Sequence, residues 1–430
     1  MGQDASPIQL SPRVSRVKLS PNAAAAARAA ALAAEGRDII ALTTGEPDFD
    51  TPDSIKQAAI DALARGETKY TPTPGTLDLR RAIGAKYRRE LDLDYGAGQI
   101  IVSNGGKQVI YSAFAATLAA GDEVIIPTPY WPSFPDMVLV NDGVPVLVAC
   151  DIQSGYKLSA AALEAAITPR TRWLVLNTPG NPSGAVYDRQ ELSALAEVLR
   201  RHPQVLVLLD ELYEHIWFTP QAPAHWLHVA PDLRARTLLV SGASKTYAMT
   251  GWRIGWGAGA ERLVQAMTVI QSQVSSGPNA IAQAATRAAL ESEDQGFAVQ
   301  ARQAYARRAR LVEAAIAEIP GLALRRIDGS FFAFVHCAGL IGQLRPDGQI
   351  IASDQDAVQW LLEAEGLAVV DGAAFGLSPY LRLSTAAADT VLEEAMKRLK
   401  RAVSALRSPQ RVIAHGQAPE PAVALSASQD

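Results

Sequence analysis

Residues 205–210 read Val-Leu-Val-Leu-Leu-Asp, and residues 237–241 read Thr-Leu-Leu-Val-Ser. Both runs are apolar, without the alternation of polar and apolar residues that marks a strand with one face in water. Such runs are typical of strands buried on both faces of a parallel sheet that helices cover. Four more runs predict strands and three stretches between them predict helices: strands 99–103, 123–127, 144–148 and 171–177, and helices 107–119, 159–167 and 188–201. The predicted fold class is therefore α/β with a mostly parallel sheet.

A second, smaller α+β unit is predicted after the helical stretch 295–319, where Pro320 and Gly321 mark a break. Its expected elements are strands 322–325, 331–335 and 367–370 and a helix that begins at Asp354. The segment before about residue 50 is too short to fold alone, so we expect it to pack on this unit. The predicted domains are a large cofactor-binding domain (50–320), a small domain (12–49 with 321–407) and a flexible, Pro-rich C-terminal tail (408–430).

Composition excludes several classes of protein. The chain has 430 residues, 48% of them hydrophobic, and 40 Lys and Arg against 44 Asp and Glu give a net charge of −4. The basic residues are scattered, so we expect no nucleic-acid partner. No apolar run reaches the roughly 18 residues of a spanning helix, so we expect no membrane partner. Cys150 and Cys337 form no CxxC pair and indicate reduced thiols in a cytoplasmic protein; no metal site is predicted.

Lys245 is the most informative single residue. It lies in Ser-Gly-Ala-Ser-Lys-Thr-Tyr-Ala-Met-Thr-Gly-Trp-Arg-Ile-Gly (241–255), just past the carboxyl end of a predicted central strand, where α/β sheets bind ligands. The stretch imitates a phosphate-binding P-loop, but Ser244 stands where the glycine before the lysine should be, and Leu239 where the first glycine should be. Taken alone, Lys245 is as compatible with a surface cation as with a Schiff-base lysine.

Other residues supply what a pyridoxal phosphate site requires, namely a carboxylate for the ring nitrogen and donors for the phenolic oxygen. Asp210 ends the strand at 205–209, and Tyr213 follows three residues later. Asn181 follows the strand at 171–177 and offers an amide donor. Each has a plain alternative, because Asp210 is also suited to a helix cap and Asn181 to a turn.

A phosphate site is predicted at the turn Gly105-Gly106-Lys107, which lies between a strand and a helix. Glycines there allow backbone amides to approach an anion at the helix N-terminus. Arg253 adds a cation suited to phosphate, and Trp131 has a ring large enough to stack on the cofactor. A core tryptophan is the competing interpretation of Trp131.

Taken together, these segments resemble the class I and II aminotransferases of fold type I, and bacterial aspartate aminotransferases most of all. Residues 242–255 fit the lysine signature of that family. Seven further motifs match in order, so that the resemblance covers about residues 12–405: Gly45-Glu-Pro-Asp-Phe-Asp50, Lys69-Tyr70, Gly105-Gly-Lys107, Pro129-Tyr-Trp131, 177–184, Asp210-Glu-Leu-Tyr213 and Leu381-Arg-Leu-Ser384. It implies pyridoxal 5'-phosphate as cofactor and a seven-stranded sheet.

The resemblance also implies a role for each matched residue. Lys245 would form the Schiff base and move the proton, and Asp210 and Tyr213 would assist it. The implied cofactor contacts are Gly105, Gly106, Lys107, Trp131, Asn181, Asp210, Tyr213, Ser241, Lys245 and Arg253, with Tyr70 reaching the phosphate of the neighbouring subunit in a homodimer. The implied substrate contacts are Gly45, Lys107, Trp131, Asn181 and Arg382, whose planar guanidinium suits an α-carboxylate.

Substrate preference is predicted from two segments. Lys107 resembles the residue that contacts a distal carboxylate, which favours aspartate and glutamate as donors and 2-oxoglutarate as acceptor. Residues 18–23 replace a Pro-Ser-x-Thr pattern, so either Asn22 substitutes for the threonine or the pocket accepts an aromatic side chain or prephenate. A carbon-sulfur lyase on the same fold is a further alternative, against which Trp131 and Lys107 argue. A non-enzymatic ligand sensor is disfavoured because no DNA-binding module is recognisable at either end.

Overall fold

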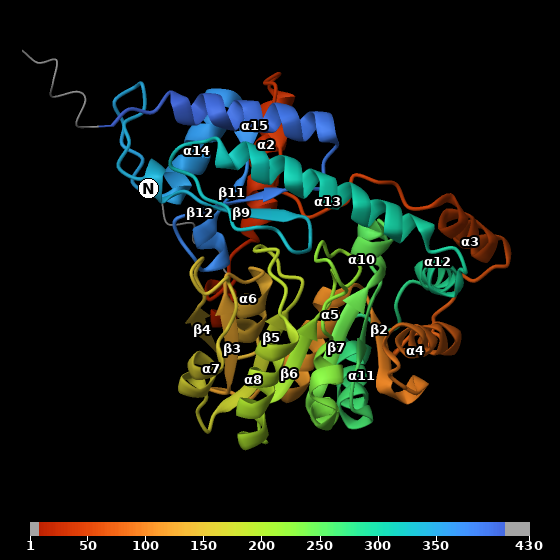
Figure 1. The fold of residues 1–430 in the computed structure, drawn as a ribbon. Coiled ribbons are helices and arrows are strands. Elements are labelled where there is room, and N and C mark those ends of the chain that lie inside the picture. The colour runs from red at the N-terminus through yellow and green to blue at the C-terminus, as the bar shows by residue number, and fades with distance from the viewer. Residues whose placement is uncertain (1–7, 409–430) are drawn as a thin grey trace, which may run out of the picture.

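The computed structural model describes residues 8–408, and a seven-stranded sheet forms its centre (Figure 1). The strand order is β2-β8-β7-β6-β5-β3-β4, and only β8 runs antiparallel to its neighbours. This confirms the predicted fold class. The strands are β2 (Ile100–Ser103), β3 (Glu123–Thr128), β4 (Val144–Ala149), β5 (Thr171–Asn177), β6 (Leu206–Asp210), β7 (Thr237–Gly242) and β8 (Gly255–Ala258). Strand β8 was not predicted, because Gly-Trp-Gly-Ala is short and glycine-rich.

Helices cover both faces of this sheet. Along β5, Leu174 and Leu176 belong to one apolar cluster, while Trp173 and Val175 belong to another on the opposite face. Both faces are therefore buried, which explains the continuous apolar runs in the sequence. The helices of this unit are α3 (Asp53–Ala64), α4 (Leu77–Leu91), α5 (Gly106–Thr117), α6 (Ser133–Val140), α7 (Ala160–Ala166), α8 (Arg189–Arg201), α9 (Trp226–Val229), α10 (Ala243–Thr246), α11 (Glu261–Val274) and α12 (Ala280–Glu291).

A second group of elements lies above the central sheet in Figure 1. Strands β11 (Val370–Asp371), β12 (Tyr380–Ser384) and β9 (Phe332–His336) form an antiparallel sheet in that order. Strand β1 (Ile40–Ala41) pairs in parallel with β10 (Leu367–Ala368), so the N-terminal segment contributes to this group. The surrounding helices are α2 (Pro21–Ala34), α14 (Asp354–Glu365), α15 (Asp389–Ser404) and the long α13 (Gly296–Ala317), which extends toward the central sheet.

Two predicted strands of this group differ from the structure. Residues 322–325 form no strand and make only the single bridge from Ala323 to His336. The predicted strand 367–370 is divided at Val369 into β10 and β11, because the chain passes there from one sheet to another. A run of apolar residues shows that a segment is buried, but it does not show which partner strand each residue meets.

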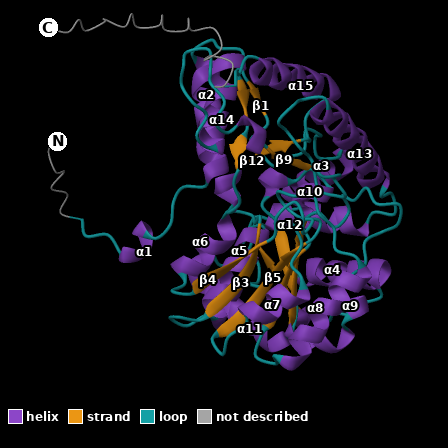
Figure 2. Cartoon of the chain, turned by 60° about the vertical axis from the view of Figure 1, so that its left-hand side comes forward, coloured by secondary structure: helices purple, strands orange, loops and turns teal. Residues whose placement is uncertain are grey.

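The N-terminal helix α1 (Pro12–Ser15) extends away from the body of the chain (Figure 2). It contacts α6, and Arg13 and Arg16 both form ion pairs with Asp142. Five 3-10 helices complete the described elements: Ala97–Gln99, Pro231–Arg236, Thr250–Trp252, Ala338–Leu340 and Gly372–Phe375. The tail predicted to be flexible, beyond Ser408, falls outside the described residues.

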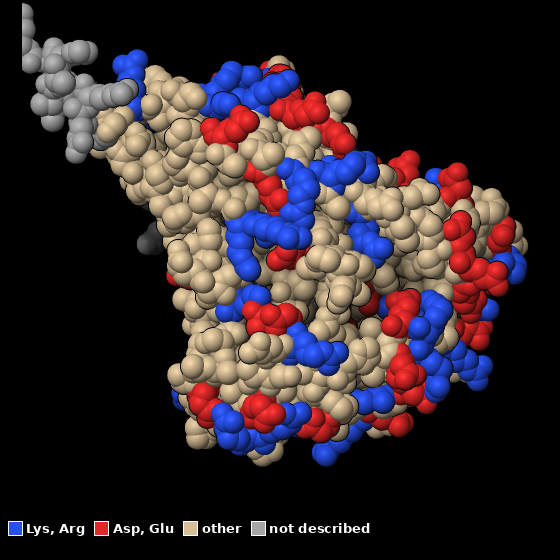
Figure 3. All heavy atoms as spheres, viewed as in Figure 1, with Lys and Arg blue, Asp and Glu red and all other residues tan. Residues whose placement is uncertain are grey.

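The sequence indicates that the basic residues are scattered. On the face shown in Figure 3, basic and acidic side chains are intermixed. Cys150 and Cys337 are buried free thiols that lie just past β4 and β9. Among residues 8–408 no helix combines the length and the apolar character needed to cross a membrane.

Candidate active site

The carboxyl ends of the parallel strands bring the predicted site residues to one edge of the sheet. Asn177 ends β5 and lies beside Asp210, which ends β6. The Asn177 side chain donates a hydrogen bond to the Asp210 carbonyl oxygen (3.0 Å) and accepts one from the Asn181 backbone N–H (2.7 Å). Asn177 therefore fixes the position of Asn181 relative to the end of β6.

Lys245 lies in α10, the short helix that follows β7. Its Nζ atom donates a hydrogen bond to the Gly45 carbonyl oxygen at 2.5 Å, so the N-terminal segment crosses over the lysine. Burial lowers the pKa of Lys245 to about 8, while the Glu46 carboxylate acts in the opposite direction. A lysine with this pKa is partly neutral near physiological pH and can act as a nucleophile or a base.

Asp210 is an acid without a counterion. Its side chain is 4% exposed and accepts a hydrogen bond from the Leu212 backbone N–H at 3.2 Å, but none of the cationic side chains of residues 8–408 forms an ion pair with it. Burial raises the pKa of Asp210 to about 7. A cation placed against this carboxylate would favour its charged form.

Tyr213 points its ring into an aromatic cluster near Asp210. The ring meets Phe331 and Phe332 edge to face, with centroids 5.3 and 5.8 Å away. Burial, with the Asp210 charge as second cause, raises the pKa of Tyr213, so its hydroxyl keeps its proton. The phenol is therefore available as a hydrogen-bond donor beside Gly45.

The predicted glycine turn forms a cradle for an anion. Gly105 adopts the left-handed φ of +89°, and α5 begins at Gly106. A Cβ atom on Gly105 would overlap the Arg253 guanidinium, so the two groups are in close contact only because residue 105 is glycine. Arg253 is held there by a hydrogen bond from Nη1 to the Thr250 carbonyl oxygen (2.8 Å). Helix N-terminus and guanidinium together suit a phosphate.

Lys107 and Trp131 lie together beside this cradle. The Lys107 Nζ atom is 4.9 Å from the centroid of the Trp131 ring, and that ring packs edge to face on Phe134. Desolvation, reinforced by the Arg253 charge, lowers the pKa of Lys107. The lysine is therefore positioned to meet an incoming anion.

Arg382 is a buried guanidinium with no carboxylate partner among the described residues. It is 1% exposed, extends from β12 and lies 4.6 Å from the Phe332 ring centroid and 4.9 Å from that of Phe375. It donates hydrogen bonds to the Thr43 carbonyl oxygen and to Asn181 Oδ1, and its Nε atom has no partner. Burial lowers its pKa to about 10. These features suit a guanidinium that binds the carboxylate of a ligand.

Two predicted residues are not brought together with the others. The Ser241 hydroxyl is fully buried and donates to Glu214 Oε1 at 2.6 Å, because its position on β7 directs it to the same side as Leu239. Tyr70 is 97% exposed, and its predicted role in a neighbouring subunit stays a prediction. Sequence reasoning in turn missed Asn177 as a positioning group, although its place at a strand end was visible.

Comparisons with known proteins agree with this geometry. Residues 37–399 match the family described as aminotransferase class I and II. The chain belongs to the class I and II aminotransferases. It is 48% identical over 394 residues to the aspartate aminotransferase of Rhizobium meliloti strain 1021, covering 92% of this chain and 96% of that protein. It is 49% identical over 391 residues to the aspartate/prephenate aminotransferase of Cereibacter sphaeroides, covering 91% and 98%.

Solved aminotransferase structures share the fold. The aspartate aminotransferase from Rhizobium meliloti superposes with a TM-score of 0.90 at 47% identity, covering 93% of this chain and all of that one. The Thermus thermophilus aspartate aminotransferase with maleate gives 0.86 at 39% identity, covering 92% and 100%. This aminotransferase fold therefore extends over nearly all of the described chain.

The residues present fit pyridoxal 5'-phosphate, the cofactor of this family of aminotransferases. Asp210 forms no ion pair with the cations of residues 8–408, and a protonated pyridine nitrogen would suit its carboxylate. The cradle at Gly105, Gly106 and Arg253 would suit the phosphate. Lys245 is near enough to Asp210 and Arg253 for both charges to act on its amine, and its pKa is lowered, which suits capture of an aldehyde.

Proposed function

We propose that this aminotransferase moves the α-amino group of aspartate or glutamate to a 2-oxo acid such as 2-oxoglutarate. The observation that carries this proposal is that a buried lysine of lowered pKa, Lys245, lies near Asp210, a buried acid that forms no ion pair with the cationic side chains of residues 8–408. The names of the relatives from Rhizobium meliloti and Cereibacter sphaeroides support the substrate class. The Thermus thermophilus relative has been solved with maleate, which is a dicarboxylate.

In this proposal each residue has one task. Pyridoxal phosphate, when bound, supplies an electron sink for the negative charge that develops at the substrate α carbon. Asp210 would favour a positive charge at the ring nitrogen, and Tyr213 and Asn181 would offer hydrogen-bond donors to the phenolic oxygen. Arg253 and the Gly105–Gly106 turn would hold the phosphate, and Trp131 would offer its ring for stacking. Lys245 Nζ would accept the proton that leaves the substrate α carbon and hold it within the site.

Arg382 orients the substrate through its α-carboxylate. Its unpartnered Nε and its two aromatic neighbours leave the carboxylate as its natural charge partner. Gly45 closes over the same place, since its carbonyl oxygen already contacts Lys245 and a Cβ atom there would lie 2.8 Å from Phe332. A substrate held at both points exposes its α C–H bond to Lys245.

A second candidate substrate is prephenate or an aromatic amino acid. The Cereibacter sphaeroides relative is named for both aspartate and prephenate. The buried Oδ1 atom of Asn22, at the start of α2, has no hydrogen-bond partner among residues 8–408. Residues 18–23 are the segment that we connect with the pocket for the substrate side chain. The Asn22 oxygen there can accept a hydrogen bond, which favours a substrate that carries a donor as well as a carboxylate.

A panel of amino donors with 2-oxoglutarate tests both candidates. We expect aspartate and glutamate to lead, with bleaching of the visible cofactor band on addition of donor. Lys107→Ala should lower kcat/KM for these two donors by about 10- to 100-fold, the value of a charge-assisted hydrogen bond, and leave neutral donors nearly unchanged. If aromatic donors or prephenate lead and Lys107→Ala has no selective effect, the second candidate replaces the first. Absence of any visible band would reject the Lys245 assignment.

We also propose a cytoplasmic homodimer in which Tyr70 completes the partner's phosphate site. Tyr70 is 97% exposed. Large apolar side chains in the segment before α2 and in α11 are also exposed, including Leu19 at 89% and Val269 at 64%. Such surface is commonly covered by a partner. The buried reduced cysteines support the cytoplasmic location.

Mixed dimers test this arrangement. Lys245→Ala and Tyr70→Ala subunits should each be strongly impaired alone. Unfolding and refolding them together should restore up to about a quarter of wild-type activity, because half of the dimers are mixed and each has one intact site. No recovery on mixing, or sedimentation as a monomer, would contradict the shared site.

A further inference from the structure

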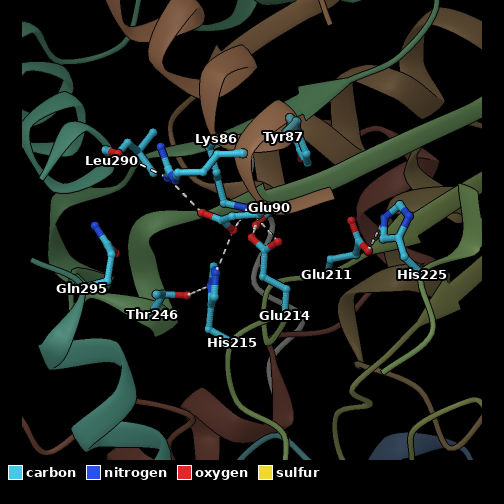
Figure 4. Close-up of polar contacts among 12 residues, drawn as sticks. Lys86, Tyr87, Glu90, Glu211, Glu214, His215, His225, Thr246, Leu290 and Gln295 are labelled. Carbon is cyan, nitrogen blue, oxygen red and sulfur yellow. Dashed lines mark hydrogen bonds and ion pairs between the residues drawn. The ribbon is translucent and has the colours of Figure 1, made fainter. Parts of the chain in front are cut away.

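A buried lysine, Lys86, lies at the centre of a charged network beside the active site (Figure 4). It extends from α4 and is 1% exposed. Its Nζ atom is 2.8 Å from Glu214 Oε2 and 3.0 Å from Glu90 Oε2. Removing a lysine from water is costly unless it is paired, and this one has two carboxylate partners.

The network reaches the two catalytic segments by separate routes. Glu214 Oε1 accepts a hydrogen bond from the Ser241 hydroxyl at 2.6 Å. Glu90 Oε2 lies 3.0 Å from His215 Nε2, and His215 Nδ1 lies 3.0 Å from Thr246 Oγ1. Two chains of polar contacts therefore begin at the Lys86 ammonium and end on either side of Lys245.

Four residues of this network are close in sequence to Tyr213 or Lys245. Glu214 and His215 directly follow Tyr213, at the end of β6. Ser241 precedes Lys245 by four residues and Thr246 follows it directly, at the end of β7. In this structure the Ser241 hydroxyl donates its hydrogen bond to Glu214.

A metal ion is the other interpretation of this cluster. Ligand atoms of Glu90, Glu214 and His215 lie within 4.8 Å of one another. The Lys86 ammonium, however, already contacts both carboxylates. Burial alone would lower its pKa, but Glu214 and Glu90 outweigh this effect and raise it, so Lys86 remains charged. The lysine thus occupies the place that a cation would take.

We propose that Lys86 is a positioning residue, whose contacts with Glu214 and Glu90 hold Tyr213 and Lys245 in register with each other. Lys86 acts through the loop after β6 and through α10, and it contacts neither substrate nor cofactor. This inference rests on the proposed function for its kinetic consequence, whereas its effect on Lys245 can be measured without turnover. Misplacement of a catalytic group by about 1 Å lowers rates by about 100-fold, so the expected effect is large.

The variant Lys86→Met keeps the length of the side chain and removes its charge. We expect kcat to fall by about 10- to 100-fold, with KM for the amino donor changed by less than about threefold, because Arg382 is untouched. Lys400→Met is the matched control, since Lys400 forms an exposed pair with Glu318. That control should retain wild-type kinetics. An unchanged kcat in folded Lys86→Met would overturn the proposal.

A double variant separates positioning from simple loss of stability. In Lys86→Met with Glu214→Gln the summed charge of residues 86, 90 and 214 returns to its wild-type value, and the amide oxygen of the introduced glutamine can still accept from Ser241. We expect this double variant to regain most of the lost kcat, to within about threefold of wild type. If the double variant is folded and no faster than Lys86→Met, charge compensation at this position does not act on the active site.

The pH dependence of Lys245 itself gives a readout that requires no turnover. In the protein freed of cofactor, reductive methylation of Lys245 followed by mass spectrometry reports its pKa, which burial sets near 8. In Lys86→Met we expect this pKa to rise by about one unit, since loosened packing admits water to the lysine. An unchanged value would contradict the proposal.

Two other outcomes must be told apart from a failure of this inference: that Lys86→Met does not fold, and that the wild-type protein is not a transaminase for the donors tested. Should Lys86→Met not fold, Ser241→Ala removes one contact of the network with little change in volume, and we expect a loss in kcat of about 3- to 10-fold. Should the wild-type enzyme turn over none of the donors, the Lys245 titration still tests the positioning role.

Discussion

Replacing Lys245 by alanine is expected to abolish transamination while the protein still binds its cofactor. The reason is that the buried Lys245 amine lies near enough to Asp210 and Arg253 for both charges to act on it, whereas the phosphate and ring contacts are proposed for other residues. Loss of the proton-transfer group alone costs about 10²- to 10⁴-fold. Because the covalent attachment is lost as well, we expect a fall in kcat of at least about 10⁴-fold. Stopped-time product analysis and equilibrium dialysis with pyridoxal phosphate measure the two effects.

Lys56→Ala is a suitable control, since Lys56 is an exposed residue of α3 that pairs with Asp53. It should retain full activity. Two results would count against the role of Lys245: normal turnover in Lys245→Ala, or loss of cofactor binding in a variant whose circular dichroism matches that of wild type. In the second case the lysine would be needed for the shape of the site instead of its chemistry.

The strand ends that carry the site could be predicted because burial leaves a continuous signal in the sequence. Runs such as 205–210 place Asp210 at the end of a buried strand, and the structure has it there, at the end of β6. Strand β8 left no such signal, since two of its four residues are glycines. It is defined instead by pairing with β2 and β7, which lie far from it in the chain.

The Lys86 network could not be predicted for a related reason. The sequence shows an apolar stripe on α4 at Leu79, Ile83 and Tyr87, and a lysine beside that stripe looks like a solvated residue. The buried Lys86 is paired with Glu214, which reaches it from the loop after β6, 128 positions away along the chain. A partner so distant cannot be read from local spacing. The contact of the Ser241 hydroxyl with Glu214 could not be foreseen for the same reason, since its acceptor lies on the same distant loop.

Replacing Asp210 by asparagine is expected to remove activity and, in the protein without cofactor, to increase stability. The carboxyl has a pKa of about 7 in the folded state, against an ordinary value of 3.8, because burial disfavours its charge. Between these two values the folded state binds the proton more tightly than the unfolded state does. The stability that this group contributes is therefore complete below about pH 4 and is lost as the pH rises toward 7. At pH 8 the wild type carries a buried charge that the Asp210→Asn variant lacks, which is worth on the order of 2–4 kcal/mol.

The measurement is urea unfolding of both cofactor-free proteins across pH 4 to 8, with the exposed Asp61→Asn as control. The free energies of unfolding of Asp210→Asn and wild type should be similar at pH 4 and should diverge in favour of the variant at pH 8. Two curves that stay parallel across this range would contradict the argument. With cofactor the order should reverse, because a ring cation favours the Asp210 carboxylate, and kcat of the variant should fall by at least about 10²-fold. Asp210 thus lowers the stability of the empty protein and becomes favourable only when a cation occupies the site, which is the behaviour expected of a group retained for chemistry.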